Sequence, residues 1–200
     1  MSVIGIASRL NGEHDVALSV KSLDTLAAQA ARYLDTSMRT AGGVLDSLVG
    51  LSRQGEPILM LVPEGTAAQD LGMEAIEVPG PFRDFQPAIR EAFRARDIQA
   101  AVLWGEAWTF PPGDEEAMSR HVKEGLMPSE HPGRQEIVFL SVHWPLGGVG
   151  WMSCWRIVRA PTGAYLRPLF ERAGQADASS PITVLSSWVD DVLPQPRPGD

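Results

Sequence analysis

Residues 136–170 read EIVFLSVHW PLGGVG WMSCWRIVR APTGA YLRPLF, and this stretch decides the fold. Its apolar runs, 136–144, 151–159 and 165–170, have the length of strands and are rich in Val, Ile, Phe and Trp, which favour strands. Short segments with proline and glycine separate the runs, as in tight turns. Strands joined by such short connections lie side by side and run antiparallel. The stretch therefore predicts an antiparallel meander.

The residues before the meander add further strands and helices. Apolar runs predict strands at 57–63, 73–78 and 98–108. Apolar residues that recur every three or four positions predict helices at 22–38, 44–51 and 85–93, and after the meander at 182–192. This order predicts an α+β fold: a mostly antiparallel sheet of about five strands, with two or three helices packed against it.

The 200 residues are enough for one self-sufficient domain, which we place at 1–193. A turn signal at 11–15 predicts an N-terminal hairpin within 1–21. A long insert, 109–134, separates two predicted strands, and inserts of this length often carry function. Residues 194–200 contain three prolines and no apolar anchor, so we expect a disordered tail.

The charge balance excludes several classes of partner. The chain has 17 Lys and Arg against 25 Asp and Glu, a net charge of −8. It therefore lacks the excess of cations that nucleic acid or an anionic membrane surface attracts. No apolar run approaches the length of about 20 residues that spans a bilayer. Cys154 is the single cysteine, which excludes an internal disulfide and favours a core residue of a cytoplasmic protein.

The segment WGEAW, residues 104–108, is the first candidate site. Side chains alternate along a strand, so Trp104, Glu106 and Trp108 share one face of the sheet. If the tryptophans cover Glu106, desolvation makes its carboxyl a candidate general acid or base. The alternative is a structural carboxylate that accepts from a loop amide or pairs with an arginine such as Arg134 or Arg156.

The second candidate site is PSEHPGRQE, residues 128–136, which carries Glu130, His131 and Arg134. The insert begins just after Glu106 and ends at this segment, so Glu106 and His131 could meet at one end of the sheet. A zinc site needs three or four converging ligands, and the histidines lack the spacing of known metal motifs. We therefore predict no metal and no cofactor.

Five of the six tryptophans fall on three successive predicted strands: Trp104, Trp108, Trp144, Trp151 and Trp155. Most clusters of this kind form a core, because tryptophan is highly buried on average. Tryptophan is also enriched at the centres of protein interfaces. If one face of the sheet is left uncovered, these residues predict a surface for a second copy of the chain or for another protein.

Three short motifs carry a resemblance. They are Glu-Ala-Trp at 106–108, Pro-Ser-Glu-x-Pro-x-Arg-x-Glu at 128–136 and Gly-x-Tyr-Leu-x-Pro-Leu at 163–169. With the helices and strands between residues 23 and 170, they resemble a group of short uncharacterised bacterial proteins without an established activity. The resemblance implies a bacterial or phage origin. This sequence departs from the group at Gly105, where serine is usual, and at His143, where an acidic residue is expected.

Two hypotheses of function follow. The first is a non-enzymatic cytoplasmic interaction module that self-associates or docks a partner protein through the tryptophan-bearing sheet face. The alternative is a small hydrolase that uses Glu106 with His131 and their neighbours Glu130 and Arg134. Convergence of Glu106 and His131 in space separates the two hypotheses.

Overall fold

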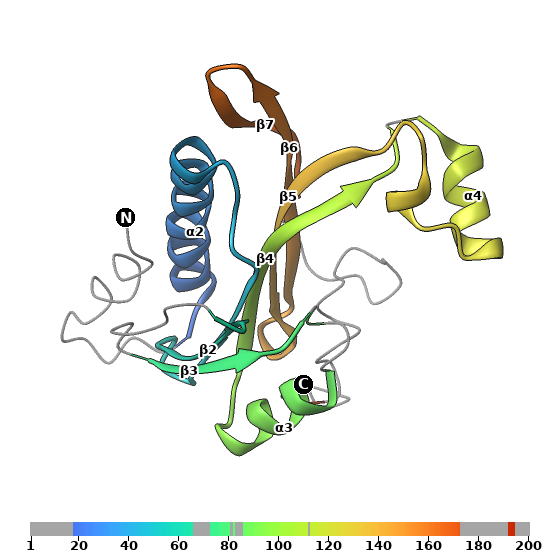
Figure 1. Cartoon of the computed structure of the whole chain (residues 1–200). Helices are drawn as coiled ribbons and strands as arrows, with labels where there is room; N and C mark the ends of the chain where they lie inside the picture. The colour runs from blue at the N-terminus through green and yellow to red at the C-terminus, as the bar shows by residue number, and fades with distance from the viewer. Residues whose placement is uncertain are drawn as a thin grey trace.

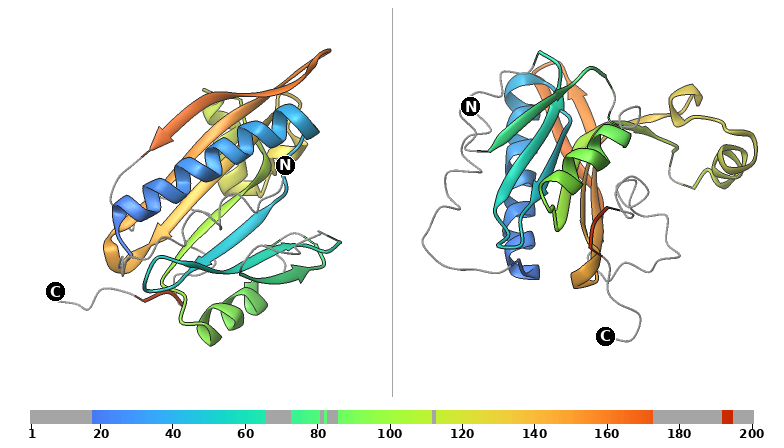
Figure 2. Two further views of the ribbon diagram at one scale, coloured as in Figure 1. Left: turned by 90° about the vertical axis from the view of Figure 1, so that its left-hand side faces the viewer. Right: turned by 90° about the horizontal axis from the view of Figure 1, so that it is seen from below.

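A computed structural model describes residues 18–65, 73–80, 82, 86–111, 113–172 and 192–194. Its centre is a seven-stranded sheet with the strand order β3-β2-β1-β4-β5-β6-β7. Helices α2 and α3 lie on opposite faces of this sheet (Figures 1 and 2). The α+β class is confirmed, and the sheet has more strands than the expected five or so.

All strands except β1 follow the predicted runs closely. They are β1 (Ser47–Leu51), β2 (Pro57–Pro63), β3 (Glu74–Val78), β4 (Ala100–Thr109), β5 (Gln135–Trp144), β6 (Val149–Ala160) and β7 (Gly163–Arg172). All neighbouring pairs are antiparallel except β2 and β3, which are parallel. The meander of β5, β6 and β7 is therefore confirmed, and the sheet as a whole is mixed.

Helix α2 (Val20–Ala41) covers one face of the sheet. At its start, the side chain of Ser19 accepts from the Ser22 N–H at 3.2 Å, which satisfies a helix-end donor. It ends at Gly42, whose φ of 73° is easy for glycine and strained for other residues. Its buried stripe contains Leu23, Leu26, Ala27, Ala30, Leu34 and Met38. The helix predicted at 22–38 is thus confirmed and is longer than predicted.

The helix predicted at 44–51 is wrong, because this segment contains strand β1. All five residues of β1 are buried, since β2 and β4 flank the strand and the helices cover its faces. Burial on both faces removes the alternation that reveals a strand in a sequence. β1 adds a strand to the centre of the predicted sheet.

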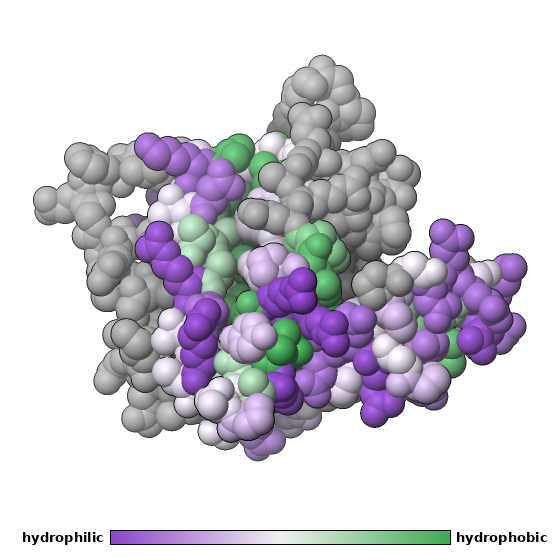
Figure 3. All heavy atoms as spheres, turned by 90° about the horizontal axis from the view of Figure 1, so that it is seen from above, coloured by the Kyte–Doolittle hydropathy of each residue, from purple (hydrophilic) through white to green (hydrophobic). Residues whose placement is uncertain are grey.

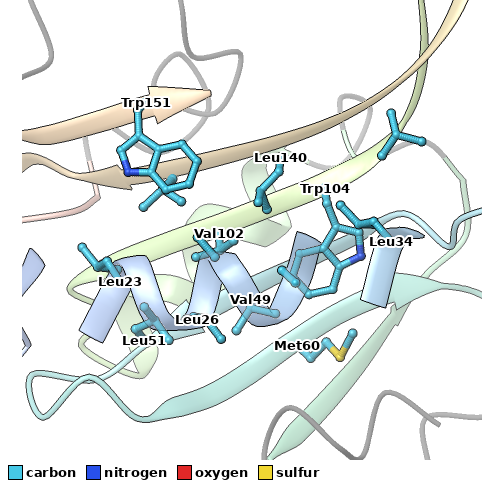
Figure 4. Close-up of a cluster of buried hydrophobic side chains, with 14 of the residues drawn as sticks. Leu23, Leu26, Leu34, Val49, Leu51, Met60, Val102, Trp104, Leu140 and Trp151 are labelled. Carbon is cyan, nitrogen blue, oxygen red and sulfur yellow. The ribbon is translucent and has the colours of Figure 1, made fainter. Parts of the chain in front are cut away.

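The sheet separates two cores. On one face, α2 packs against β4, β5 and β6, where Trp104, Leu140 and Trp151 point toward Leu23, Leu26 and Leu34 (Figure 4). On the other face, α3 (Gln86–Ala95) packs Ile89, Ala92 and Phe93 against strands from β3 to β4. The helix predicted at 85–93 is confirmed. Each helix covers only part of its face of the sheet. On the face that carries α3, no described helix covers β6 and β7.

The insert forms an arm, defined here as the described residues between 109 and 134, which projects from the ends of β4 and β5 (Figures 1 and 2). It contains α4 (Glu115–Glu124) and the short helix η2 (Pro128–Glu130). Seen from above, its surface is mainly hydrophilic (Figure 3). Its apolar residues Phe110 and Ala117 are buried within it.

Several expectations fall on residues outside the described ranges. Residues 1–17 of the predicted hairpin, the helix at 182–191 and the tail at 195–200 are among them. Val20, at the end of the predicted hairpin, begins helix α2. None of the helices in the described part of the chain has the length and apolar character needed to cross a membrane.

Candidate functional site

Glu106 holds the connection between α2 and β1 in place. Its Oε1 accepts a hydrogen bond from the backbone N–H of Val44 at 2.6 Å. Its own backbone N–H donates to Oδ1 of Asp46 at 3.0 Å. The carboxylate therefore bonds to a loop amide, which is the structural alternative that the sequence left open, and its described hydrogen bonds do not involve Arg134 or Arg156.

Asp46 lies against the other side of the same strand. Burial raises the pKa of its carboxyl above the ordinary value. The N–H of Glu106 lowers this pKa and the charge of Glu106 raises it further. Gly105 makes the approach of Asp46 possible, because a Cβ at this position would overlap the Asp46 carboxylate. The Asp46 bond and the missing side chain of Gly105 depend on each other.

Arg159 adds a third bond to this connection. Its guanidinium donates to Glu136 Oε2 at 2.6 Å and to the carbonyl oxygen of Gly42 at 3.0 Å. Glu106, Asp46 and Arg159 therefore hold both ends of the loop that follows α2. The carboxylates are already occupied by backbone and arginine donors, as expected for groups that fix a structure.

His131 is held within the arm. Its Nδ1 accepts from the N–H of Gly133 at 3.0 Å, so in the neutral ring the proton lies on Nε2. Nε2 is 3.1 Å from Oδ2 of Asp114, whose Oδ1 accepts from Ala117 N at the start of α4. Phe110 meets the imidazole edge to face at 5.7 Å between centroids. Both ring nitrogens are engaged, which leaves neither free for a substrate proton.

The two predicted catalytic residues have separate surroundings. The described hydrogen bonds of Glu106 involve Val44 and Asp46, and those of His131 involve Gly133 and Asp114. No residue is common to the two sets. The structure therefore brings each side chain to its own local partners and shows no described contact between them.

The neighbours chosen with His131 also serve the arm. Oε2 of Glu130 accepts from the N–H of Met127 at 2.9 Å and closes the turn before η2. The Arg134 guanidinium lies over the ring of Trp108, 4.8 Å from its centroid, in a cation–π contact. This contact attaches the base of the arm to β4.

The tryptophans divide between core and surface. Trp104 is 1% exposed and Trp151 is also buried, so both belong to the core under α2. Trp144 and Trp155 are half-buried at the margin of this core. Trp108 is 40% exposed and lies under Arg134. The face on which the sequence placed an interface is thus covered by α2 over most of its tryptophans.

Two exposed aromatic residues of β7 lie on the opposite face, at the outer edge of the sheet. Ile157 and Leu166 pack toward α2, so their neighbours Arg156, Val158, Tyr165 and Arg167 point away from it. Tyr165 is 43% exposed and Phe170, opposite Cys154, is 47% exposed. We name this surface the arginine patch; it consists of Arg156, Val158, Tyr165, Arg167 and Phe170.

Arg156 and Arg167 are directly opposite each other in the register of β6 and β7. Within the described part of the chain neither arginine has an ion pair or a hydrogen bond from its side chain. Sequence reasoning missed this pair, although a signal was present. A two-residue turn at 161–162 pairs residue 160 with 163, and the same count pairs 156 with 167.

Other features of the described residues add no site of comparable definition. A pocket of about 310 Å³ in the arm is lined mainly by Thr109, Phe110, Pro111 and Met118, beside the occupied carboxylate of Asp114. Among the described residues, no group of three or more His, Cys, Asp or Glu is placed to hold a metal ion.

Comparison with protein-family models, with curated proteins and with solved structures finds no match to this chain.

Proposed function

We propose that the protein is a non-enzymatic interaction module that binds a partner protein through the arginine patch. The observation that carries this proposal is the placement of Arg156 directly opposite Arg167 on an exposed sheet face, with no acidic partner in the described residues. Like charges that face each other across two strands reduce stability by a few tenths of a kcal/mol or more. Binding of a complementary partner offsets this cost.

The side chains around the two arginines suit a protein partner. Tyr165 and Phe170 flank Arg167 along β7 and are both exposed. Tyrosine, phenylalanine and arginine are enriched in protein interfaces, and tyrosine and arginine often dominate the binding energy. Val158 and the partly buried Phe139 extend the apolar surface toward β5.

Three features oppose self-association at this edge of the sheet. A second copy packed face to face about a two-fold axis would bring its own Arg156 and Arg167 against the first pair. The net charge of −8 also makes two copies repel each other. Pairing of β7 edge to edge is interrupted at Pro168, which has no N–H to donate. We therefore favour another protein as the partner.

The hydrolase alternative lacks a comparable observation. The Glu106 carboxylate accepts from the Val44 amide, and both nitrogens of His131 are engaged inside the arm. These bonds stabilise local structure. They provide neither a free base nor an activated nucleophile.

The proposal is tested by photocrosslinking in the cells from which the protein comes. A photoreactive amino acid is placed at Tyr165 or, as a control, at the exposed Leu146 at the far end of the β5–β6 hairpin. We expect a discrete product from position 165 that is absent from position 146 and is lost when Arg156 and Arg167 are changed to Thr. The purified partner should then bind Phe170→Ser at least tenfold more weakly than wild type. The same products from both positions, or none from position 165, would overturn the proposal.

A further inference from the structure

We infer that the partner presents an extended segment with the pattern apolar-x-acidic-x-apolar, whose carboxylate is shared by Arg156 and Arg167. This inference rests on the proposed function and names the chemistry of its ligand. Its basis is the order of side chains along β7, where Tyr165, Arg167 and Phe170 lie on the face opposite α2.

The spacing of the patch matches an extended chain. Tyr165 and Arg167 are two residues apart on one strand, a separation of roughly 6.6 Å. Phe170 follows after the register shift between Cys154 and Trp155, which places it opposite Cys154 on the same face. In an extended ligand, side chains at alternate positions share one side and have the same spacing of roughly 6.6 Å. A segment that runs along β7 therefore brings an acidic residue over the arginines and apolar residues over Tyr165 and Phe170.

The two guanidinium groups are close enough to share one carboxylate. Residues directly opposite in an antiparallel pair have Cβ atoms about 5 Å apart. A carboxylate has two oxygens and about four acceptor positions, so each oxygen can accept from a different arginine. A single negative charge between the two arginines also removes their mutual repulsion, whereas a neutral side chain does not.

A carboxylate is favoured over a phosphate-rich partner by the rest of the chain. Long nucleic acid carries a row of phosphates, and its binding needs many cations to displace counterions. Here the net charge is −8, and Arg159 and Arg96 are engaged by Glu136 and Glu74. The arginine pair is thus a local cationic spot flanked by aromatic side chains.

Nuclear magnetic resonance titration of the full chain tests the inference with defined probes. The peptide Leu-Thr-Glu-Thr-Phe and its glutamine counterpart Leu-Thr-Gln-Thr-Phe are added separately to isotope-labelled protein, to concentrations of several millimolar. For a peptide this short we expect a dissociation constant of about 1 mM. Saturable shifts should be confined to the amides of the arginine patch, and the glutamine peptide should bind at least tenfold more weakly.

Two variants with matched loss of charge complete the experiment. Arg156→Thr with Arg167→Thr should abolish the preference for the glutamate peptide, because both positive charges are removed. Threonine is chosen because it favours strands and preserves the sheet. Lys21→Thr with Arg32→Thr removes the same charge from exposed positions on α2 and should leave binding unchanged.

The outcomes separate the inference from the proposed function. Equal binding of the two peptides overturns the acidic preference and leaves the interaction module standing. Tighter binding of inorganic phosphate than of the glutamate peptide, measured on the same amides, overturns the choice of a carboxylate. If neither peptide shifts the patch and crosslinking at Tyr165 yields no product, both proposals fail.

Discussion

Glu106 and Val44 are 62 residues apart in the chain, and the carboxylate of one accepts the backbone N–H of the other at 2.6 Å. The bond joins the middle of the sheet to the loop that follows the long helix α2. Asp46 accepts the Glu106 N–H from the same loop. A residue that the sequence singled out as a candidate acid thus determines how α2 connects to the sheet.

Replacing Glu106 tests this structural role directly. Glu106→Ala leaves the Val44 N–H without its acceptor, and we expect the free energy of unfolding to fall by about 1–3 kcal/mol. Glu106→Gln retains a carbonyl oxygen at the same place and should lose less than half as much. Urea denaturation at pH 7 measures both, with the exposed Glu56→Ala as a control. Wild-type stability in both Glu106 variants would show that the bond contributes nothing.

Asp46 predicts a specific dependence of stability on pH. Burial raises its pKa in the folded protein above the value in the unfolded chain, so the folded state binds more protons between the two values. Stability from this group is complete below the unfolded pKa of about 3.8 and decreases as the pH rises through the folded pKa.

Asp46→Asn removes this ionisation and retains an oxygen acceptor for the Glu106 N–H. The variant should therefore gain stability relative to wild type as the pH is raised from about 3.5 to 7, when unfolding is measured in urea at each pH. An Asn variant whose deficit is the same at every pH would contradict the assigned role of the charge.

Gly105 and Asp46 should behave as a coupled pair. A methyl group at Gly105 displaces the Asp46 carboxylate and breaks its bond to the Glu106 N–H. Overpacking of this kind costs about 1–3 kcal/mol. Asp46→Ala removes the obstacle, so Gly105→Ala should cost much less in that background. A double-mutant cycle of unfolding free energies measures the coupling, and additive effects would argue against the contact.

Elements with one buried side and one exposed side were predicted correctly from the sequence, whereas a strand buried on both faces was not. α2 shows a clear apolar stripe because one side is buried and the other is wet, and the meander strands are marked by short turns. β1 was misread because every residue in it is buried, so Leu48 and Leu51 fit a helical period by chance. The sequence left open a bond from the Glu106 carboxylate to a loop amide, but it did not identify Val44 as the partner, since no local pattern specifies contact across 62 positions.

The arginine pair shows the opposite case. The register that places Arg156 opposite Arg167 could be predicted from the sequence, whereas the exposure of the pair could not. The turn at 161–162 fixes which residues of β6 and β7 are opposite each other. Whether Arg156 and Arg167 find acidic partners depends on how the other elements pack, and α3 covers the sheet only toward β3. From the sequence, tryptophans such as Trp104 were the candidate interface residues, but in the fold Trp104 is buried in the core.

The reactivity of Cys154 tests whether Phe170 shields the sheet beneath the arginine patch. It lies on the same face as the arginine patch, opposite Phe170, yet it is only 2% exposed, and burial raises the pKa of its thiol to about 12. From an ordinary value of 9.0, this shift reduces the thiolate fraction at pH 8 by roughly a thousandfold. The native protein should therefore react with a thiol reagent far more slowly than the protein in urea, as measured by absorbance at pH 8. Phe170→Ala should accelerate the native reaction by opening access to the sulfur, whereas the exposed Leu146→Ala should leave it unchanged. Rapid stoichiometric labelling of the folded wild type would show that Phe170 does not shield the Cys154 thiol from the reagent.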